Sequence, residues 1–216
     1  FSLDSTDVHF TDVFEDADGS LLVIDTGGWF RIGCPTSQIA KPDIYGAIYR
    51  IRKAGGDIPA DPRGLRIDWK KAATRELVRL LDDDRFAVRD RAIATLANRG
   101  GAAVSSLSEA LKKPSARLCL NAVWSLARIG SPKSLAALRP ALKDKDAGVR
   151  QAACHSAAIL RDKSAASELM ALVGTDVPPV QREAAAALGR IGEERAVPAI
   201  LKVLERSVDR QLEHAL

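Results

Sequence analysis

From residue 74 onwards, apolar residues recur at helical spacing, and the whole pattern repeats about every 30 residues. Within each unit they fall at i, i+4 and i+7 or i+8, which is the stripe on one face of an amphipathic helix. The same apolar residues recur in the first helix of each unit, at Leu77, Leu107, Leu138, Leu169 and Ile200, and at Leu81, Leu111, Leu142, Val173 and Leu204. Their spacings of 30, 31, 31 and 31 residues predict stacked helix pairs that share one core.

The second helix of each unit carries an alanine where neighbouring helices cross, and small residues let helices approach closely there. These alanines are Ala92, Ala122, Ala153 and Ala184. Gly100, Gly130 and Gly192 follow three of the second helices, as suits a left-handed residue at a helix end. Pro140 falls inside a first helix, which it should kink. We therefore expect a mainly α fold, a right-handed α-solenoid of about 4.5 repeats of 30–31 residues.

The first 53 residues show a different, β-type pattern. Val8 to Val13 lead into the turn sequence "DADGS", and "LLVID" and "GAIYRIRK" follow as two further strands. A 17-residue loop from Trp29 to Tyr45 separates the last two strands. We predict a small antiparallel β segment in residues 1–53, a linker and capping segment in 54–73, and the solenoid in 74–216. Trp69 would cap the N-terminal end of the solenoid.

Charge is spread unevenly over these segments. The net charge is −3 in residues 1–53, +1 in 54–73 and +6 in 74–216. A basic helical half suits an acidic protein partner or nucleic acid. Because its bases are interleaved with acids, an ordinary solvated helix surface explains them too. The residues that would carry such binding are arginines that we expect to be exposed on the concave face, namely Arg89, Arg117, Arg150 and Arg182.

The helical repeats resemble HEAT repeats, in the short form also seen in bilin-lyase-like proteins. The motif Asp-x-x-Val-Arg-x-x-Ala carries the resemblance, as "DAGVRQAA" at 146–153 and partly as "RFAVRDRA" at 85–92. The last unit stops in the middle of a helix, at "DRQLEHAL", so we expect the natural chain to continue.

The β segment resembles the last blade of a six-bladed propeller of the glucose/sorbosone dehydrogenase type. The residues that carry this resemblance are "DGSLLVID" and the loop with its strand, "GGWFRIGCPTSQIAKPDIYGAIYRI". The form is similar to the membrane-bound dehydrogenases of planctomycetes and verrucomicrobia, in which HEAT repeats and a c-type cytochrome domain with a CxxCH haem site follow the propeller. The resemblance implies a periplasmic or exported protein that oxidises a sugar or alcohol and passes electrons to a c-type haem, with a quinone or calcium as further cofactors.

This chain contains neither the earlier blades nor a CxxCH motif, so no catalytic residue of that family falls on it. We expect a non-catalytic scaffold fragment whose partners are the propeller and cytochrome domains of the same chain, with a further protein partner on the solenoid groove. Through the resemblance, His9 and Asp12 would point to the propeller channel, although a structural hydrogen bond explains His9 as well. Trp29, Arg31 and Cys34 would form a loop that either covers a propeller face or fixes the junction between the domains.

The sequence gives weaker support to two other candidate sites, both in the β segment. The sequence Asp25-Thr26-Gly27 is typical of aspartic proteases, but their chemistry needs two such carboxylates and this chain has one such motif. Asp25 more naturally ends a strand by accepting hydrogen bonds from turn amides. The "DADG" sequence lacks the glutamate that closes a calcium loop.

A binding module for nucleic acid, like the solenoid DNA glycosylases, is the alternative function. Residues 74–216 offer only Phe86 and Trp124 as aromatic residues for a base, and we expect no metal site.

Overall fold

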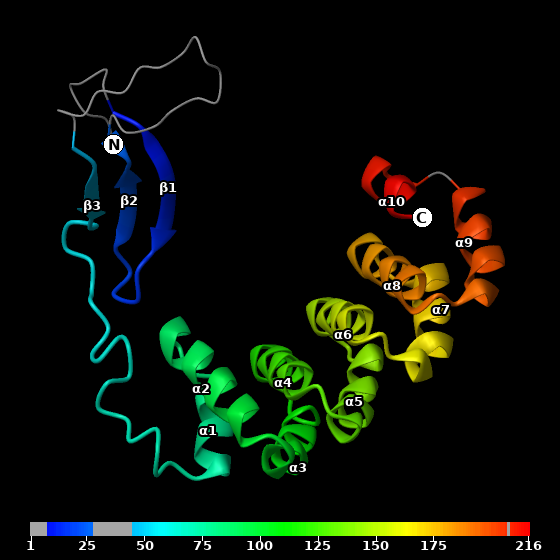
Figure 1. Cartoon of the computed structure of the whole chain (residues 1–216), viewed down its shortest axis with the longest axis horizontal. Helices are drawn as coiled ribbons and strands as arrows, with labels where there is room; N and C mark the ends of the chain where they lie inside the picture. The colour runs from blue at the N-terminus through cyan, green and yellow to red at the C-terminus, as the bar shows by residue number, and fades with distance from the viewer. Residues whose placement is uncertain (1–7, 28–44, 207) are drawn as a thin grey trace. The chain divides into compact units, whose positions relative to one another are not determined.

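The computed structural model describes residues 8–27, 45–206 and 208–216. The chain divides into two compact units, Phe1–Arg66 and Ile67–Leu216, and Figure 1 shows their elements. The division falls within the segment 54–73 that the sequence marks as a linker.

The first unit contains a three-stranded antiparallel sheet. Strand β1 (Phe10–Glu15) pairs with β2 (Leu21–Asp25), and β2 pairs with β3 (Ala47–Ile51), in the order β1-β2-β3. In the register, Val13 lies opposite Val23, and Val23 lies opposite Tyr49. The β1–β2 register shifts between Phe10 and Asp12, so β1 carries an irregularity there.

Ion pairs hold the turn between β1 and β2. Asp16 accepts a hydrogen bond of 2.7 Å from Arg50 Nη1 and a second one from Arg63. Asp18 accepts from the backbone N–H of Ser20 at 3.0 Å and from Arg52 Nη2 at 3.0 Å. The pKa of Asp16 is lowered, mainly by the Arg50 hydrogen bond. Arginines of this chain therefore occupy the carboxylates that a calcium ion would need.

The second unit is a stack of helix pairs. Its first helices are α1 (Thr74–Leu80), α3 (Gly101–Ala110), α5 (Pro132–Leu138), α7 (Ala166–Thr175) and α9 (Val197–Leu204). Its second helices are α2 (Phe86–Arg99), α4 (Ala116–Ile129), α6 (Ala147–Leu160), α8 (Pro178–Ile191) and α10 (Arg210–Ala215). Short 3₁₀ turns are η2 (Arg139–Lys143), η3 (Lys163–Ala165) and η4 (Glu194–Ala196). The mainly α solenoid with a small N-terminal sheet, expected from the sequence, is confirmed.

The core of the stack is the row of apolar residues that the spacing predicted. Leu77, Leu107, Leu138 and Leu169 are at most 1% exposed, and the four crossing alanines are fully buried. Trp69 joins this core, and the guanidinium of Arg91 lies 4.7 Å from its ring centroid. The row weakens at α9, where Ile200 is half-buried and Leu204 is 37% exposed. The two leucine rows are therefore less completely buried at this end, and Leu111, after α3, is half-buried as well.

Helix ends follow local chemistry. Asp146 begins α6 by accepting a hydrogen bond from the N–H of Val149 at 3.1 Å, and Ser115 does the same for α4. Gly130 and Gly192 are left-handed, as expected. Pro140 does not kink a continuous helix: α5 ends at Leu138 and the chain continues as η2. Proline lacks the N–H that the next α-helical hydrogen bond requires, and its ring clashes with the preceding turn.

Candidate binding surface of the helical unit

The second helices α2, α4, α6 and α8 each expose three residues spaced by four, which lie on one face of the helix. This set, called the second-helix stripe below, consists of Asp90, Ala94 and Asn98; Leu120, Trp124 and Arg128; Gln151, His155 and Ile159; and Arg182, Ala186 and Arg190. All of them are exposed or half-buried. In Figure 1, the second helices follow one side of the unit and the first helices follow the other.

The middle of the stripe is aromatic and apolar. The rings of Trp124 and His155 meet edge to face with their centroids 5.8 Å apart, although they come from different repeats. His155 Nδ1 lies 3.2 Å from Glu183 Oε2, which fixes the imidazole on the other side. Ile159 is 57% exposed one turn further along α6. This arrangement presents a partly apolar surface that extends over α4 and α6.

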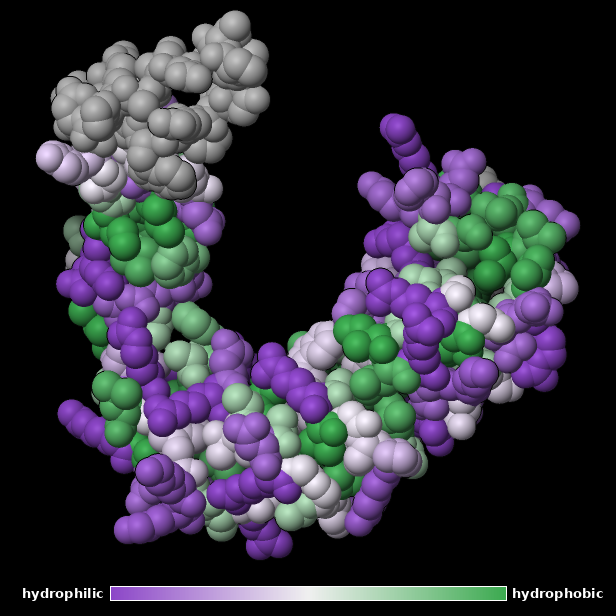
Figure 2. Space-filling model, in the orientation of Figure 1, coloured by the Kyte–Doolittle hydropathy of each residue, from purple (hydrophilic) through white to green (hydrophobic). Residues whose placement is uncertain are grey.

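Positive charge borders this centre. Arg128 and Arg190 are exposed near the C-terminal ends of α4 and α8, and within the described residues no ion pair is found for either side chain. Arg182 lies 3.7 Å from Asp209 and is 33% exposed. Asp90 is the acid of the stripe itself, so the stripe carries a positive net charge. Figure 2 shows hydrophilic side chains beside apolar patches over the helical unit.

Two of the four arginines expected to bind a partner, Arg89 and Arg150, hydrogen-bond to turn carbonyls of their own repeats. Arg89 Nη1 donates to the carbonyl oxygens of Asp83 and Asp84 at 2.7 and 2.8 Å. Arg150 Nη1 donates in the same way to Asp144 and Lys145, at 2.8 and 3.0 Å. Both therefore fasten the turn between the first and second helix of their own repeat.

Other residues take the same role at this repeat position. Counted by the repeat spacing, Cys119 and Gln181 are the equivalents of Arg89 and Arg150. Gln181 Nε2 donates to the carbonyl oxygen of Val173 at 2.8 Å, and Cys119 Sγ lies 3.4 Å from the carbonyl oxygen of Lys113. In four successive repeats the side chain at this position thus contacts carbonyl oxygens in the last turn of the first helix or in the turn that follows it.

Arg150 also forms the best-shielded ion pair of the described residues. Its Nε and Nη2 atoms each lie 2.6 Å from an oxygen of Asp176, and the two side chains are 16% and 7% exposed. The hydrogen bonds from Arg150 lower the pKa of Asp176 despite its burial. The expectation of an exposed Arg150 is therefore wrong, because the side chain turns back onto its own repeat and the next.

Arg117 and Arg182 occupy other repeat positions. Arg117 Nε donates to Asp82 Oδ1 at 2.8 Å, and its Nη2 contacts Asp84 at 3.0 Å, so it ties α4 to the α1–α2 turn of the preceding repeat. Its side chain is 45% exposed. The four arginines thus do not form one row, and of the four only Arg182 belongs to the second-helix stripe. Their role in binding a partner stays a prediction.

The structure describes some of the residues that the sequence marks as candidate sites in the β segment. The backbone N–H of His9 donates to Asp25 Oδ1 at 3.0 Å, and His9 is exposed. Asp12 is exposed and accepts from the N–H of Val13 at 2.8 Å. Asp25 also accepts from the N–H of Gly27 at 2.9 Å, and these two amides, Gly27 first, lower the pKa of Asp25. It closes a turn, as its sequence context suggests. Trp29, Arg31 and Cys34 lie outside the described residues.

The two described cysteines are core residues. Cys119 and Cys154 are free and buried, and burial raises the pKa of Cys154 to about 12. Within the described ranges, no three His, Cys, Asp or Glu side chains lie close enough together to hold a metal ion. No helix in the described part of the chain has the length and apolar content needed to cross a bilayer.

The sequence alone did not identify the Trp124–His155 pair. Trp124 falls at a spacing that also suits a core residue, and His155 stands beside a buried cysteine. The available signal is the repeat register: Ala94, Trp124, His155 and Ala186 are equivalent positions, and only adjacent repeats can bring the two rings together.

Comparisons with known proteins agree with this geometry. The family profile of HEAT repeats matches residues 104–180 and 142–216, which together cover more than half of the chain. The chain therefore belongs to the HEAT-repeat proteins. Comparison with curated proteins gives no match.

Solved structures show the same fold. A chain from the complex of CpcE and CpcF of phycocyanin lyase from Nostoc sp. PCC7120 is 24% identical with a TM-score of 0.53, and the match covers 73% of this chain and 67% of that one. A designed armadillo repeat protein in complex with the peptide (KR)4 is 24% identical with a TM-score of 0.45, covering 66% and 78%. At 24% identity, the similarity to the phycocyanin lyase chain shows the solenoid fold and nothing more.

Proposed function

We propose that the helical unit is a non-catalytic scaffold that binds a protein partner on the second-helix stripe. The observation that carries this proposal is the Trp124–His155 pair at 5.8 Å, with Ile159 57% exposed beside it. Aromatic residues and arginines dominate the binding energy of protein interfaces when they stand at the centre of a contact. Arg128 and Arg190 favour an acidic surface on the partner, since complementary charge guides association.

The fold itself supports this function. A stack of helix pairs presents one long continuous surface, which solenoids commonly use to bind extended partners. The similar phycocyanin lyase chain was solved in a complex of two proteins, which is in keeping with a protein partner.

The same proposal has a wider context. We infer that the chain is part of a larger periplasmic or exported redox protein of the propeller–HEAT–cytochrome type, which oxidises a sugar or alcohol and passes electrons to a c-type haem. A quinone or calcium would then belong to the propeller. The first partners of the stripe would be the other domains of that protein.

The β sheet supports this context through its exposed apolar residues. Val13 shares one sheet face with Val23 and is 58% exposed, whereas Ile48 shares the other face with Ile24 and is 69% exposed. A propeller blade buries both faces against neighbouring blades. The coding sequence on either side tests the context: it should contain further blade motifs upstream and CxxCH downstream, and their absence would refute it.

Site-directed photocrosslinking tests the stripe. A benzoylphenylalanine in place of Ile159 should give a discrete protein adduct in cells that produce the protein, while one in place of Lys133, exposed on α5, should not. Trp124→Ala should remove the adduct because it deletes the central ring of the surface. Equal adducts at both positions, or an adduct that Trp124→Ala leaves unchanged, would contradict the proposal.

A further inference from the structure

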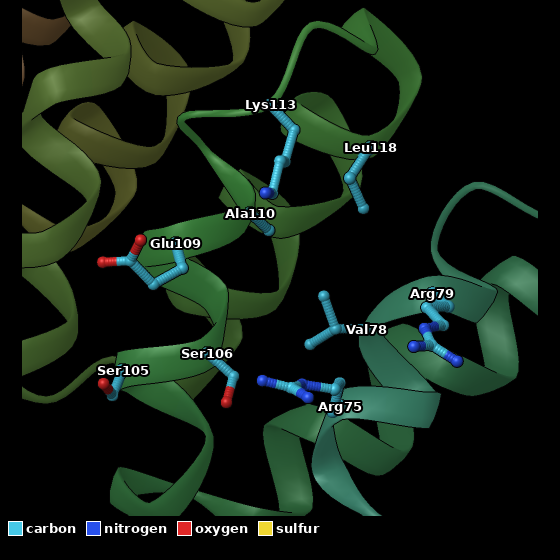
Figure 3. A pocket seen from close by; sticks show the side chains of 9 residues that line it. All are labelled: Arg75, Val78, Arg79, Ser105, Ser106, Glu109, Ala110, Lys113 and Leu118. Carbon is cyan, nitrogen blue, oxygen red and sulfur yellow. The ribbon is translucent and has the colours of Figure 1, made fainter.

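A cavity of about 510 Å³ lies on the first-helix side of the unit, between α1 and α3. Figure 3 shows the cavity between Arg75, Val78 and Arg79 of α1 and Ser106 and Ala110 of α3. Lys113 and Leu118 complete its wall. The volume falls in the range of about 300–1,000 Å³ that is usual for small-molecule sites.

The wall combines three cations with an apolar floor. Arg75, Arg79 and Lys113 are exposed, and within the described residues none of the three forms an ion pair. Val78 and Leu118 are half-buried and Ala110 is 3% exposed, so the floor between the cations is apolar. Arg75 and Arg79 are four residues apart on one helix face, where like charges repel. An anion bound between them would relieve that repulsion.

The acid of the cavity, Glu109, interacts electrostatically with Lys113, but among the described residues it forms no ion pair with Arg75 or Arg79. Glu109 accepts a hydrogen bond from Lys112 Nζ at 2.7 Å. In Figure 3, its carboxylate points away from Arg75 and Arg79. The Ser106 side chain lies near the Arg75 guanidinium in the same view and can donate a further hydrogen bond to a ligand.

The other layers lack this arrangement. The repeat register places Ser105 and Glu109 of α3 at the positions of Arg75 and Arg79, and Ala136 and Pro140 in the layer after that. The cavity between α3 and η2, which Ser108 and Pro140 help to line, has a volume of about 90 Å³. The paired arginines and the large cavity therefore occur together in the first layer and are not a consequence of the repeat itself.

We propose that this cavity binds a small organic phosphate monoester, with its phosphate between Arg75, Arg79 and Lys113 and its apolar part on Val78 and Leu118. Guanidinium groups match phosphate oxygens with two parallel hydrogen bonds, and three cations suit a dianion better than a single carboxylate. The site lies on the first helices and is independent of the second-helix stripe.

Isothermal titration of the whole chain with phenyl phosphate, inorganic phosphate and benzoate tests the proposal. Phenyl phosphate should bind saturably, about tenfold more tightly than inorganic phosphate because its ring covers the apolar floor. It should also bind about tenfold more tightly than benzoate, which carries one charge. Titrations at low ionic strength and at about 0.15 M salt should keep this order.

A matched pair of double variants locates the site. Arg75→Gln/Arg79→Gln should weaken phenyl phosphate binding by about tenfold or more, since it removes both guanidinium contacts. Arg128→Gln/Arg190→Gln removes the same charge from the second-helix stripe and should change the affinity by less than about twofold. Circular dichroism should show both variants folded, because all four side chains are exposed.

Three results would overturn the proposal. The first is no saturable binding of phenyl phosphate, and the second is equal weakening in both double variants, which would indicate attraction to net charge alone. The third is binding of inorganic phosphate or benzoate as tight as that of phenyl phosphate, which would exclude the stated ligand class.

Discussion

Arg161 occupies a left-handed backbone position that glycine fills in neighbouring repeats. Its φ and ψ angles are 49° and 47° at the end of α6, where Gly130 and Gly192 end α4 and α8. A residue with a side chain in this region destabilises the folded state by about 1–2 kcal/mol. Glycine avoids this strain and costs only the larger conformational entropy that it loses on folding. Arg161→Gly should therefore raise the free energy of unfolding by about 0.5–1 kcal/mol in urea denaturation.

Gly130→Ala is the matched control for this prediction. A Cβ at Gly130 would meet its nearest neighbours at 3.7 and 3.8 Å, so the substitution introduces backbone strain without a clash. It should lower the free energy of unfolding by about 1 kcal/mol. If both variants move stability in the same direction, left-handed strain is not the cause.

The Arg150–Asp176 pair makes stability depend on pH. Folding lowers the pKa of Asp176, first through the hydrogen bonds from Arg150, so the folded protein binds that proton less tightly than the unfolded chain. The contribution of the ionised Asp176 carboxylate to the free energy of unfolding is complete above the pKa of an aspartate in the unfolded chain, about 3.9. It is lost as the pH falls through the lower pKa of Asp176 in the folded protein. Asp176→Asn should cost about 2 kcal/mol at pH 7, and its difference from the wild type should shrink below about pH 4.

Urea unfolding across this pH range checks the prediction. Asp90→Asn is the control, since Asp90 is exposed and, within the described residues, no ion pair is found for it. This variant should follow the wild type at every pH. A constant difference between Asp176→Asn and the wild type from pH 7 to pH 3 would show that the carboxylate charge is not what matters.

Single residues were the hardest to predict from sequence. The turn role of Asp25 follows from its local sequence context and was expected. The inward turn of Arg150 was not, because the Asp-x-x-Val-Arg motif marks the repeat without showing where the guanidinium points. Its partners, Asp144 and Asp176, lie in the turns of two successive repeats, which only the folded stack brings together.

At the scale of elements, periodicity predicted nearly everything that depends on burial. Helix pairs, crossing alanines and the leucine rows all follow from which positions must avoid water. The two features that the pattern did not predict have local causes. Pro140 converts the end of a first helix into a 3₁₀ turn, and the row opens at Leu204, which is 37% exposed. A sequence pattern indicates which face is apolar, but not how much of it the neighbouring layer covers.

Leu138 tests the stacking at this scale. It is 1% exposed in the core of α5, so Leu138→Ala should lower the free energy of unfolding by about 3 kcal/mol through lost burial and the cavity left behind. Each repeat contacts mainly its neighbours, so amide hydrogen exchange should accelerate most in α5 and α6. Ala136→Gly, an exposed position on the same helix, should cost about 1 kcal/mol. Uniform acceleration in all helices for Leu138→Ala would contradict a layered stack.

At the scale of the whole molecule, the chain consists of two units that are compact separately. The boundary at Arg66 falls in a segment whose glycines and prolines already suggested a linker. The family and the fold of the second unit could be predicted from its repeats. The second-helix stripe and the cation-lined cavity could not, because each arises where side chains from different repeats meet.

The fragment Ile67–Leu216 should therefore fold alone. Its core includes Trp69, Leu77 and Leu81, which cover the first face of the stack. Far-UV circular dichroism should show a cooperative thermal transition. Between the described elements β3 and α1, proteases should cut the whole chain within residues 52–60, which are exposed throughout.

A shorter fragment that begins at Phe86 is the control. It lacks α1 and the three residues of that covering face, so it should unfold at a lower temperature than the fragment from Ile67. If the two fragments unfold at the same temperature, or if the longer one shows no cooperative transition, the second unit is not an independent folding unit.

The uneven burial along the stack has a mechanical consequence. In α8 seven residues between Val180 and Ile191 are buried, whereas Val203 is the buried residue of α9. A load applied between the ends of this unit would be borne by layer interfaces of unequal strength. The α9–α10 end would unfold first, and the chain it releases would account for the first increase in length. The layers around α4 and α6 would stay folded at that load.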